Sequence, residues 1–106
     1  MKVGLIGLGR MGEGMSRRMI KAGIEVHGYR KNHKKAEEQY EKGYISGYTT
    51  SIESLVQVIR STPSDKRAPG IFMMVVPAET AGDTINELLQ FCVEGDIIID
   101  HGNSNF

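Results

Sequence analysis

The sequence lacks several features that would assign a functional class by themselves. Its 106 residues include one cysteine, Cys92, which excludes an internal disulfide and a cysteine-rich metal site. The apolar stretch around Cys92 favours a buried structural thiol over a reactive one. Lysine and arginine total 13, as do aspartate and glutamate, and this balance argues against general binding to nucleic acid. No apolar run approaches the roughly 20 residues that span a membrane, and no signal-peptide pattern is present, so a cytoplasmic protein is expected.

Predicted strands and helices alternate along the chain, without repeats or low-complexity tracts. Such alternation is typical of a doubly wound, mostly parallel α/β sheet of Rossmann type with helices on both faces. The length predicts one domain, residues 1–106. Strands are predicted at 2–7, 25–29, 46–48, 71–76 and 97–100, and helices at 11–22, 33–42, 52–59 and 80–92. A loop is predicted at 60–70.

Residues at the helix ends and on the helix faces support this assignment. Asn32 and Ser51 are expected to be N-caps, whereas Gly23 and Gly43 suit helix ends. Helical spacing predicts that four side chains of the first helix face the sheet, namely Met11, Met15, Met19 and Ala22. The same spacing predicts one apolar side on the last helix, formed by Ile85, Leu88, Leu89 and Cys92.

The first predicted strand runs into a Gly-x-Gly-x-x-Gly turn. Gly7 permits the tight turn, Gly9 lets the backbone approach a pyrophosphate, and Gly12 allows close packing of the helix on the strand. Backbone amides near Arg10, Met11 and Gly12 would face the phosphates at the positive helix end. Glycine triplets of this kind also arise by chance, so the alternative to dinucleotide binding is a packing turn without a ligand. Because a strand leads in, and a helix and a second strand follow, dinucleotide binding is favoured.

The end of the second strand bears on which dinucleotide binds. An NAD-preferring domain would place an acidic side chain there to accept a hydrogen bond from the ribose 2′-hydroxyl. Residues 29–35 contain no acid. Arg30 and Lys31 would pair with a 2′-phosphate, and Asn32 could hydrogen-bond to it. The alternative, a solvated basic helix start, fits Lys34 and Lys35. NADP is therefore predicted rather than NAD.

The carboxyl ends of the later strands supply further candidates, because ligands of open α/β sheets lie at those ends. Val75, Val76 and Pro77 could line the wall beneath a nicotinamide or ribose, although Pro77 could equally do no more than stop the strand. Asn103 offers both a donor and an acceptor, which suits a carboxamide or a sugar hydroxyl. His101 is a conceivable general base, but a turn histidine without chemistry is favoured over it.

No metal ligands are predicted. The candidate cofactor-binding residues are Gly7, Leu8, Gly9, Arg10, Met11, Gly12, Arg30, Lys31, Asn32, Val75, Val76, Pro77 and Asn103.

Together these residues resemble the 6-phosphogluconate dehydrogenase family, within the wider β-hydroxyacid dehydrogenases. Residues 7–12 are similar to the first turn of the family. Residues 30–32 occupy the place of its Asn-Arg-Thr/Ser segment, which grips the 2′-phosphate. Residues 95–104 are similar to its Gly-Asp-(Ile)n-Asp-Gly-Gly-Asn-Ser segment, where hydroxyisobutyrate-type relatives have Asp-x-Ser-Thr. The resemblance covers nearly the whole chain.

The resemblance implies an enzyme that oxidises 6-phosphogluconate at C3 and decarboxylates it to ribulose 5-phosphate, forming NADPH. It implies that Asn103 contacts both cofactor and substrate, and that the full enzyme is a homodimer. His101 and Val76 depart from the family pattern, which has a glycine and often a lysine at those places. The family's catalytic lysine and glutamate, its substrate-binding Ser-Gly-Gly segment and its helical domain would lie beyond Phe106. The chain is therefore expected to be a C-terminally truncated fragment that contains no catalytic residue.

Two alternatives to this interpretation remain. One is the cofactor domain of another β-hydroxyacid dehydrogenase, against which residues 100–104 argue. The other is a stand-alone dinucleotide-binding module without catalysis.

Overall fold

The computed structural model describes residues 2–60 and 70–100. Nine elements alternate in the predicted order, so every predicted strand and helix is present. They are β1 (Lys2–Ile6), α1 (Arg10–Lys21), β2 (Glu25–Tyr29), α2 (His33–Glu41), β3 (Gly47–Thr49), α3 (Ile52–Arg60), β4 (Ile71–Met74), α4 (Ala78–Leu89) and β5 (Ile97–Asp100). The loop predicted at 60–70 lies outside the described residues, except that Arg60 ends α3 and Gly70 precedes β4.

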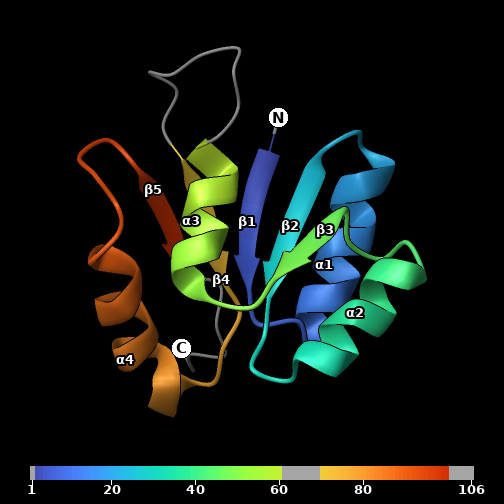
Figure 1. The fold of residues 1–106 in the computed structure, drawn as a ribbon, viewed down its shortest axis with the longest axis horizontal. Helices are drawn as coiled ribbons and strands as arrows, with labels where there is room; N and C mark the ends of the chain where they lie inside the picture. Colours follow the sequence, from blue (N-terminus) through green and yellow to red (C-terminus); the bar gives the residue numbers. More distant parts are fainter. Residues whose placement is uncertain (1, 61–69, 101–106) are drawn as a thin grey trace.

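The five strands form one sheet in the order β3-β2-β1-β4-β5, and every neighbouring pair is parallel (Figure 1). The chain begins in the centre with β1 and proceeds outward to β3. It then returns through α3 and places β4 on the other side of β1. This reversal confirms the predicted Rossmann-type class and puts the topological switch point between β1 and β4.

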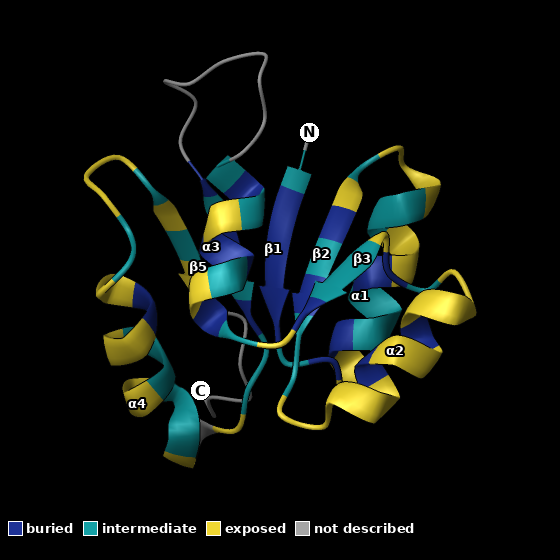
Figure 2. Cartoon of the chain, viewed as in Figure 1, coloured by how far each residue is buried: buried dark blue, intermediate teal, exposed yellow. Residues whose placement is uncertain are grey.

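The sheet separates two apolar cores. Successive side chains of β1 point to opposite faces, so Leu5 and Ile6 belong to different cores. Leu5 packs with Val26 and with Ala36 of α2 on the face that α1 and α2 cover. Ile6 packs with residues of α3, α4 and β4, among them Phe72, on the other face. The buried colour along β1 in Figure 2 shows a central strand covered on both sides, as is usual for parallel sheets.

Most helix termini form as predicted. The Asn32 side chain accepts a hydrogen bond from the Lys35 backbone N–H at 3.1 Å, and Ser51 Oγ accepts one from the Ser54 N–H at 3.0 Å. The glycine after α2, Gly43, has a φ of 79°, a conformation that favours glycine. The sequence therefore indicated these boundaries correctly.

The prediction of which helix side chains face the sheet is only partly correct. In α1, Met15 and Met19 are half-buried, but Met11 is 54% exposed and Ala22 is also exposed. In α4, Leu89 is 55% exposed. For Met11, Ala22 and Leu89 the prediction is wrong.

The face that α1 turns toward the sheet differs from the predicted one because of a backbone contact. A Cβ atom at Gly12 would lie 2.0 Å from the carbonyl oxygen of Gly7, so the helix touches the end of β1 at that point. This contact turns Gly12 and Ser16 inward, and both are buried. Ser16 Oγ donates a hydrogen bond to the Tyr44 carbonyl at 2.6 Å. Methionine burial therefore does not set the orientation of α1.

Several boundaries differ from those predicted. β4 ends at Met74 instead of Val76, because β1 turns away after Ile6, and the Val75 N–H makes the last bond to it, at 2.8 Å. β3 is shifted by one residue from 46–48. α4 begins at Ala78, directly after its N-cap Pro77, rather than at residue 80.

A buried carboxylate joins α3, β4 and the turn before β5. The Asp96 side chain is 3% exposed, forms an ion pair with Arg60, and accepts backbone hydrogen bonds from Gly70 and Val93, each at 2.9 Å. Burial alone would raise the pKa of Asp96, but these hydrogen bonds outweigh it and hold the pKa below its ordinary value. Cys92 is half-buried beside this group. Burial and the charge of Asp96 raise the pKa of its thiol, which fits the predicted structural role.

Within the described residues, no helix is long and apolar enough to cross a bilayer. The same residues contain no group of three or more His, Cys, Asp or Glu side chains placed to hold a metal ion.

Candidate functional site

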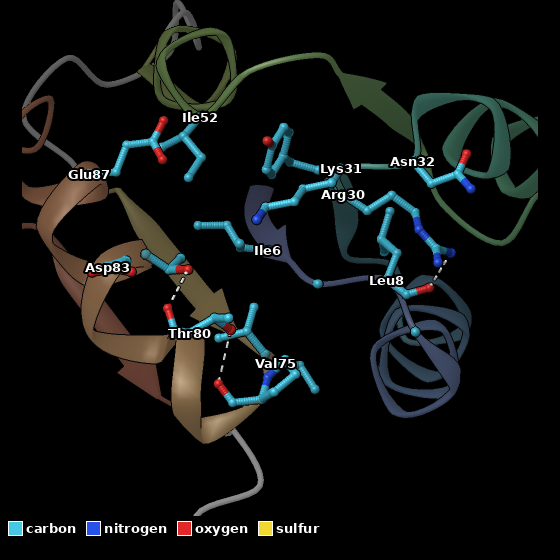
Figure 3. A pocket seen from close by; sticks show the side chains of 16 residues that line it. Ile6, Leu8, Arg30, Lys31, Asn32, Ile52, Val75, Thr80, Asp83 and Glu87 are labelled. Carbon is cyan, nitrogen blue, oxygen red and sulfur yellow. Dashed lines mark hydrogen bonds between the residues drawn. The ribbon is translucent and has the colours of Figure 1, made fainter.

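A cavity of about 510 Å³ lies at the carboxyl ends of the central strands (Figure 3). Its lining comes from the end of β1 and the turn after it, the end of β2 and the turn after it, the start of α3 at Ile52, the segment between β4 and α4, and one side of α4 from Thr80 to Glu87. This is the switch point of the sheet, where open α/β folds hold their ligands. Of the predicted site residues, those that line the cavity are Gly7, Leu8, Gly9, Arg30, Lys31, Asn32, Val75, Val76 and Pro77.

The three glycines of the first turn have different physical reasons for lacking a side chain. Gly7 has a φ of 98°, and its Cβ atom would lie 2.1 Å from the carbonyl oxygen of Val75. Gly12 is fixed by its contact with Gly7. Gly9 has an ordinary extended conformation, and a Cβ atom there would meet no protein atom within 4 Å. The fold therefore requires Gly7 and Gly12, whereas nothing in the described protein requires Gly9.

The positive end of α1 lies beside this turn. The first helical hydrogen bond runs from the Glu13 N–H to the Gly9 carbonyl at 2.8 Å. The N–H groups of Arg10, Met11 and Gly12 precede it and have no acceptor within the helix. The side chains of Arg10 and Met11 are exposed and do not line the cavity, so only their backbone can serve a ligand there.

Arg30 and Lys31 leave the end of β2 in different directions. In Figure 3 the Lys31 side chain extends into the cavity, whereas Arg30 turns toward the glycine turn. Arg30 Nη1 donates a hydrogen bond to the Leu8 carbonyl at 2.9 Å. Asn32 also lines the cavity, although its side-chain oxygen caps α2. The structure thus places all three predicted residues beside one another, but only Lys31 is aimed at the cavity centre.

A buried glutamine lies behind Arg30. Gln39 of α2 is 7% exposed, and its Nε2 donates to the Leu8 carbonyl and to Glu13 Oε1, both at 2.9 Å. Its Oε1 accepts a longer hydrogen bond from Arg30 Nη1, at 3.4 Å. These contacts of Gln39 were not predicted from the sequence. The available signal was the position of Gln39, three residues after the buried Ala36, where a polar side chain needs partners.

The opposite wall of the cavity belongs to α4 and is acidic. Thr80, Asp83, Thr84 and Glu87 line it at helical spacing, while the other side of this helix packs on the core. Burial, followed by the charge of Glu87, raises the pKa of Tyr29 on the floor of the cavity. This polar stripe on α4 was not predicted, although its i, i+3, i+4, i+7 spacing is visible in the sequence. The cavity consequently has cations on one wall and carboxylates on the other.

Pro77 lies three residues after β4 ends at Met74, so the alternative that it only stops the strand is wrong. It precedes the first residue of α4 with a φ of −58°, and it also lines the cavity with Val75 and Val76. The predicted candidates Asn103 and His101 lie outside the described residues.

Comparison with known proteins connects this geometry to a family. The family described as the NAD binding domain of 6-phosphogluconate dehydrogenase matches residues 2–106. The chain is 36% identical over 108 residues to decarboxylating 6-phosphogluconate dehydrogenase from Chlamydia trachomatis, and the match covers 98% of this chain and 21% of that protein. It is 34% identical to the NADP(+)-dependent, decarboxylating enzyme from Bacillus subtilis, with 99% and 22% covered. The chain therefore spans about a fifth of the length of these relatives.

A solved structure shows the same fold. The 6-phosphogluconate dehydrogenase of Plasmodium falciparum superposes with a TM-score of 0.80 at 24% identity, covering 100% of this chain and 22% of that one.

Proposed function

The chain belongs to the family of NAD-binding domains of 6-phosphogluconate dehydrogenase, and on that premise we propose that it binds NADP as part of a decarboxylating enzyme of this kind. In the whole enzyme, a homodimer, 6-phosphogluconate is oxidised and decarboxylated to ribulose 5-phosphate while NADP accepts a hydride. The residues described here serve cofactor binding and not substrate chemistry.

The observation that carries the choice of NADP is the charge at the end of β2. Lys31 extends into the cavity, Arg30 lies beside it, and no acidic residue occurs between positions 29 and 35. A 2′-phosphate would pair with these cations, whereas the 2′-hydroxyl of NAD would find no carboxylate at this strand end. The similarity to a Bacillus subtilis relative named as NADP(+)-dependent supports the same choice.

The remaining cavity residues suit the rest of the cofactor. The pyrophosphate would lie at Gly9, where no protein atom fills the space, and would accept hydrogen bonds from the first N–H groups of α1. Val75, Val76 and Pro77 would form the apolar wall on the nicotinamide side. Asn103 would contact cofactor and substrate, as the family pattern implies.

The cofactor assignment is tested by titrating the chain with NADP and with NAD. Removal of the Lys31 ammonium (Lys31→Ala) should weaken NADP binding by about tenfold or more, since a hydrogen bond to a charged group contributes roughly 1.5–3 kcal/mol. NAD, which lacks the 2′-phosphate, should lose less than about twofold for the same reason. Arg30→Ala should act in the same direction.

Lys34→Ala is the matched control, because Lys34 is exposed on α2 and does not line the cavity. It should leave both affinities close to those of the wild type. Equal affinity of the wild type for NADP and NAD would contradict the assignment, as would a Lys31→Ala variant that keeps its preference.

A further inference from the structure

We propose that Gln39 is a positioning residue that maintains the preference for NADP from outside the cavity, by keeping the charge of Arg30 free of a neighbouring carboxylate. The inference rests on the proposed function, since it concerns the same 2′-phosphate site. Gln39 itself does not line the cavity. Its effect on the cofactor would therefore pass through Arg30 and the glycine turn.

The orientation of the Gln39 amide follows from its partners. The Leu8 carbonyl and the Glu13 carboxylate are both acceptors, so the NH₂ group must face them. The amide oxygen then faces Arg30, which can only donate. A flipped amide would set donor against donor and acceptor against acceptor. The three contacts thus fix one arrangement of the side chain.

This arrangement separates an acid from a guanidinium. Glu13 is satisfied by Gln39, while Arg30 donates to two neutral oxygens, those of Leu8 and Gln39. Among the described residues, the ion pairs do not include Arg30. Within residues 2–60 and 70–100, its guanidinium therefore has no carboxylate in direct contact. A 2′-phosphate benefits from such a charge, whereas an uncharged 2′-hydroxyl gains much less.

The same contacts join Arg30 to the glycine turn. The Leu8 carbonyl, between Gly7 and Gly9, accepts from both Arg30 and Gln39 at 2.9 Å. The pyrophosphate turn and the guanidinium consequently share one anchor on α2. A change at Gln39 should affect binding of the 2′-phosphate more than binding of the pyrophosphate, because Arg30 is the charged group that Gln39 contacts.

The variant Gln39→Glu tests this inference directly. The new carboxylate would pair with Arg30 and neutralise it, so the ratio of the NAD to the NADP dissociation constant should fall by about tenfold, equivalent to 1.4 kcal/mol. NAD affinity should change by less than about twofold, since its 2′-hydroxyl makes no ionic contact. Gln57→Glu introduces the same change at an exposed position of α3 and should leave the ratio as in the wild type.

A double variant separates charge from stability. Glu13→Gln combined with Gln39→Glu restores a carboxylate–amide pair between positions 13 and 39 but keeps the carboxylate against Arg30. Thermal stability should recover relative to Gln39→Glu, whereas the preference for NADP should stay low. If the exchange restores the preference, the effect was structural and the inference is wrong. Should Gln39→Glu fail to fold, the double variant alone decides.

The outcomes distinguish the two proposals. A wild-type chain that binds NADP and NAD equally contradicts the proposed cofactor itself. A wild-type preference that Arg30→Ala removes and both Gln39 variants leave intact contradicts only the role of Gln39.

Discussion

The glycines of the first turn are required for different reasons, some for folding and one for the proposed binding. The space that a side chain at Gly12 would need is occupied by the Gly7 carbonyl oxygen, which would lie 2.0 Å from a Cβ atom there. Gly12→Ala should therefore push α1 away from β1. We expect a loss of about 3 kcal/mol of unfolding free energy, the upper end for overpacking, measured by urea denaturation. Dinucleotide binding should be lost in the same variant.

Two further alanine variants serve as comparisons for the destabilisation expected of Gly12→Ala. Gly14 lies in α1 with only the Arg18 guanidinium near its missing Cβ, at 3.9 Å, so Gly14→Ala should stabilise by about 0.5–1 kcal/mol. In Gly9→Ala the new Cβ atom would meet no protein atom within 4 Å, so the free energy of unfolding should stay unchanged while dinucleotide affinity falls. A Gly9→Ala variant with wild-type affinity would show that no pyrophosphate approaches this position.

At the scale of elements, the Asp96 group joins α3 to the sheet edge far from the cavity. Asp96→Asn would place an NH₂ group where Asp96 now accepts from Arg60 and from backbone N–H groups. We expect a loss of about 1.5–3 kcal/mol at neutral pH, since the hydrogen bonds that are lost are made to a charged carboxylate. Urea denaturation at several pH values measures the loss.

The pH dependence has a definite sign. The pKa of Asp96 in the folded protein is below its ordinary value of 3.8, so its stabilisation is complete above that value. It is lost as the pH falls through the folded-state pKa, and the difference between wild type and Asp96→Asn should shrink there. The same change at the exposed Asp83 should cost less than about 0.5 kcal/mol. A constant difference between wild type and Asp96→Asn across this range would exclude the ion pair as its cause.

At the scale of the whole molecule, we expect NADP binding without NADPH formation. The chain spans about a fifth of the length of its relatives, and the described cavity is lined by strand ends, the turns that follow them, the start of α3 and one side of α4. A preparation of these 106 residues should therefore bind NADP but form no NADPH from 6-phosphogluconate, as followed by the absorbance of the reduced cofactor.

The same preparation supplies the control for that measurement. An NADP titration shows whether the site is intact, so an absent rate is not mistaken for unfolded protein. Any dependence of NADPH formation on 6-phosphogluconate would show that catalytic groups are present in this chain.

The order of elements and the glycine turn were predictable from the sequence because their signals are local. Apolar strands, the caps at Asn32 and Ser51, and the absence of an acid after β2 are read from neighbouring residues. Gly7, Gly9 and Gly12 are recognised by their spacing, and the cavity lies at the edge of the sheet where they predicted a site.

Only the tertiary structure decided how these parts meet. Gln39 reaches Leu8 and Glu13 from positions 31 and 26 residues away, and no local pattern encodes those contacts. The close packing at Gly12 was predicted from the glycine spacing, whereas the exposure of Met11 was not. The sequence by itself determined the fold and the kind of site. The packing of α1, α2 and α4 on the sheet decided which side chains face the cavity, because that packing depends on contacts between distant residues.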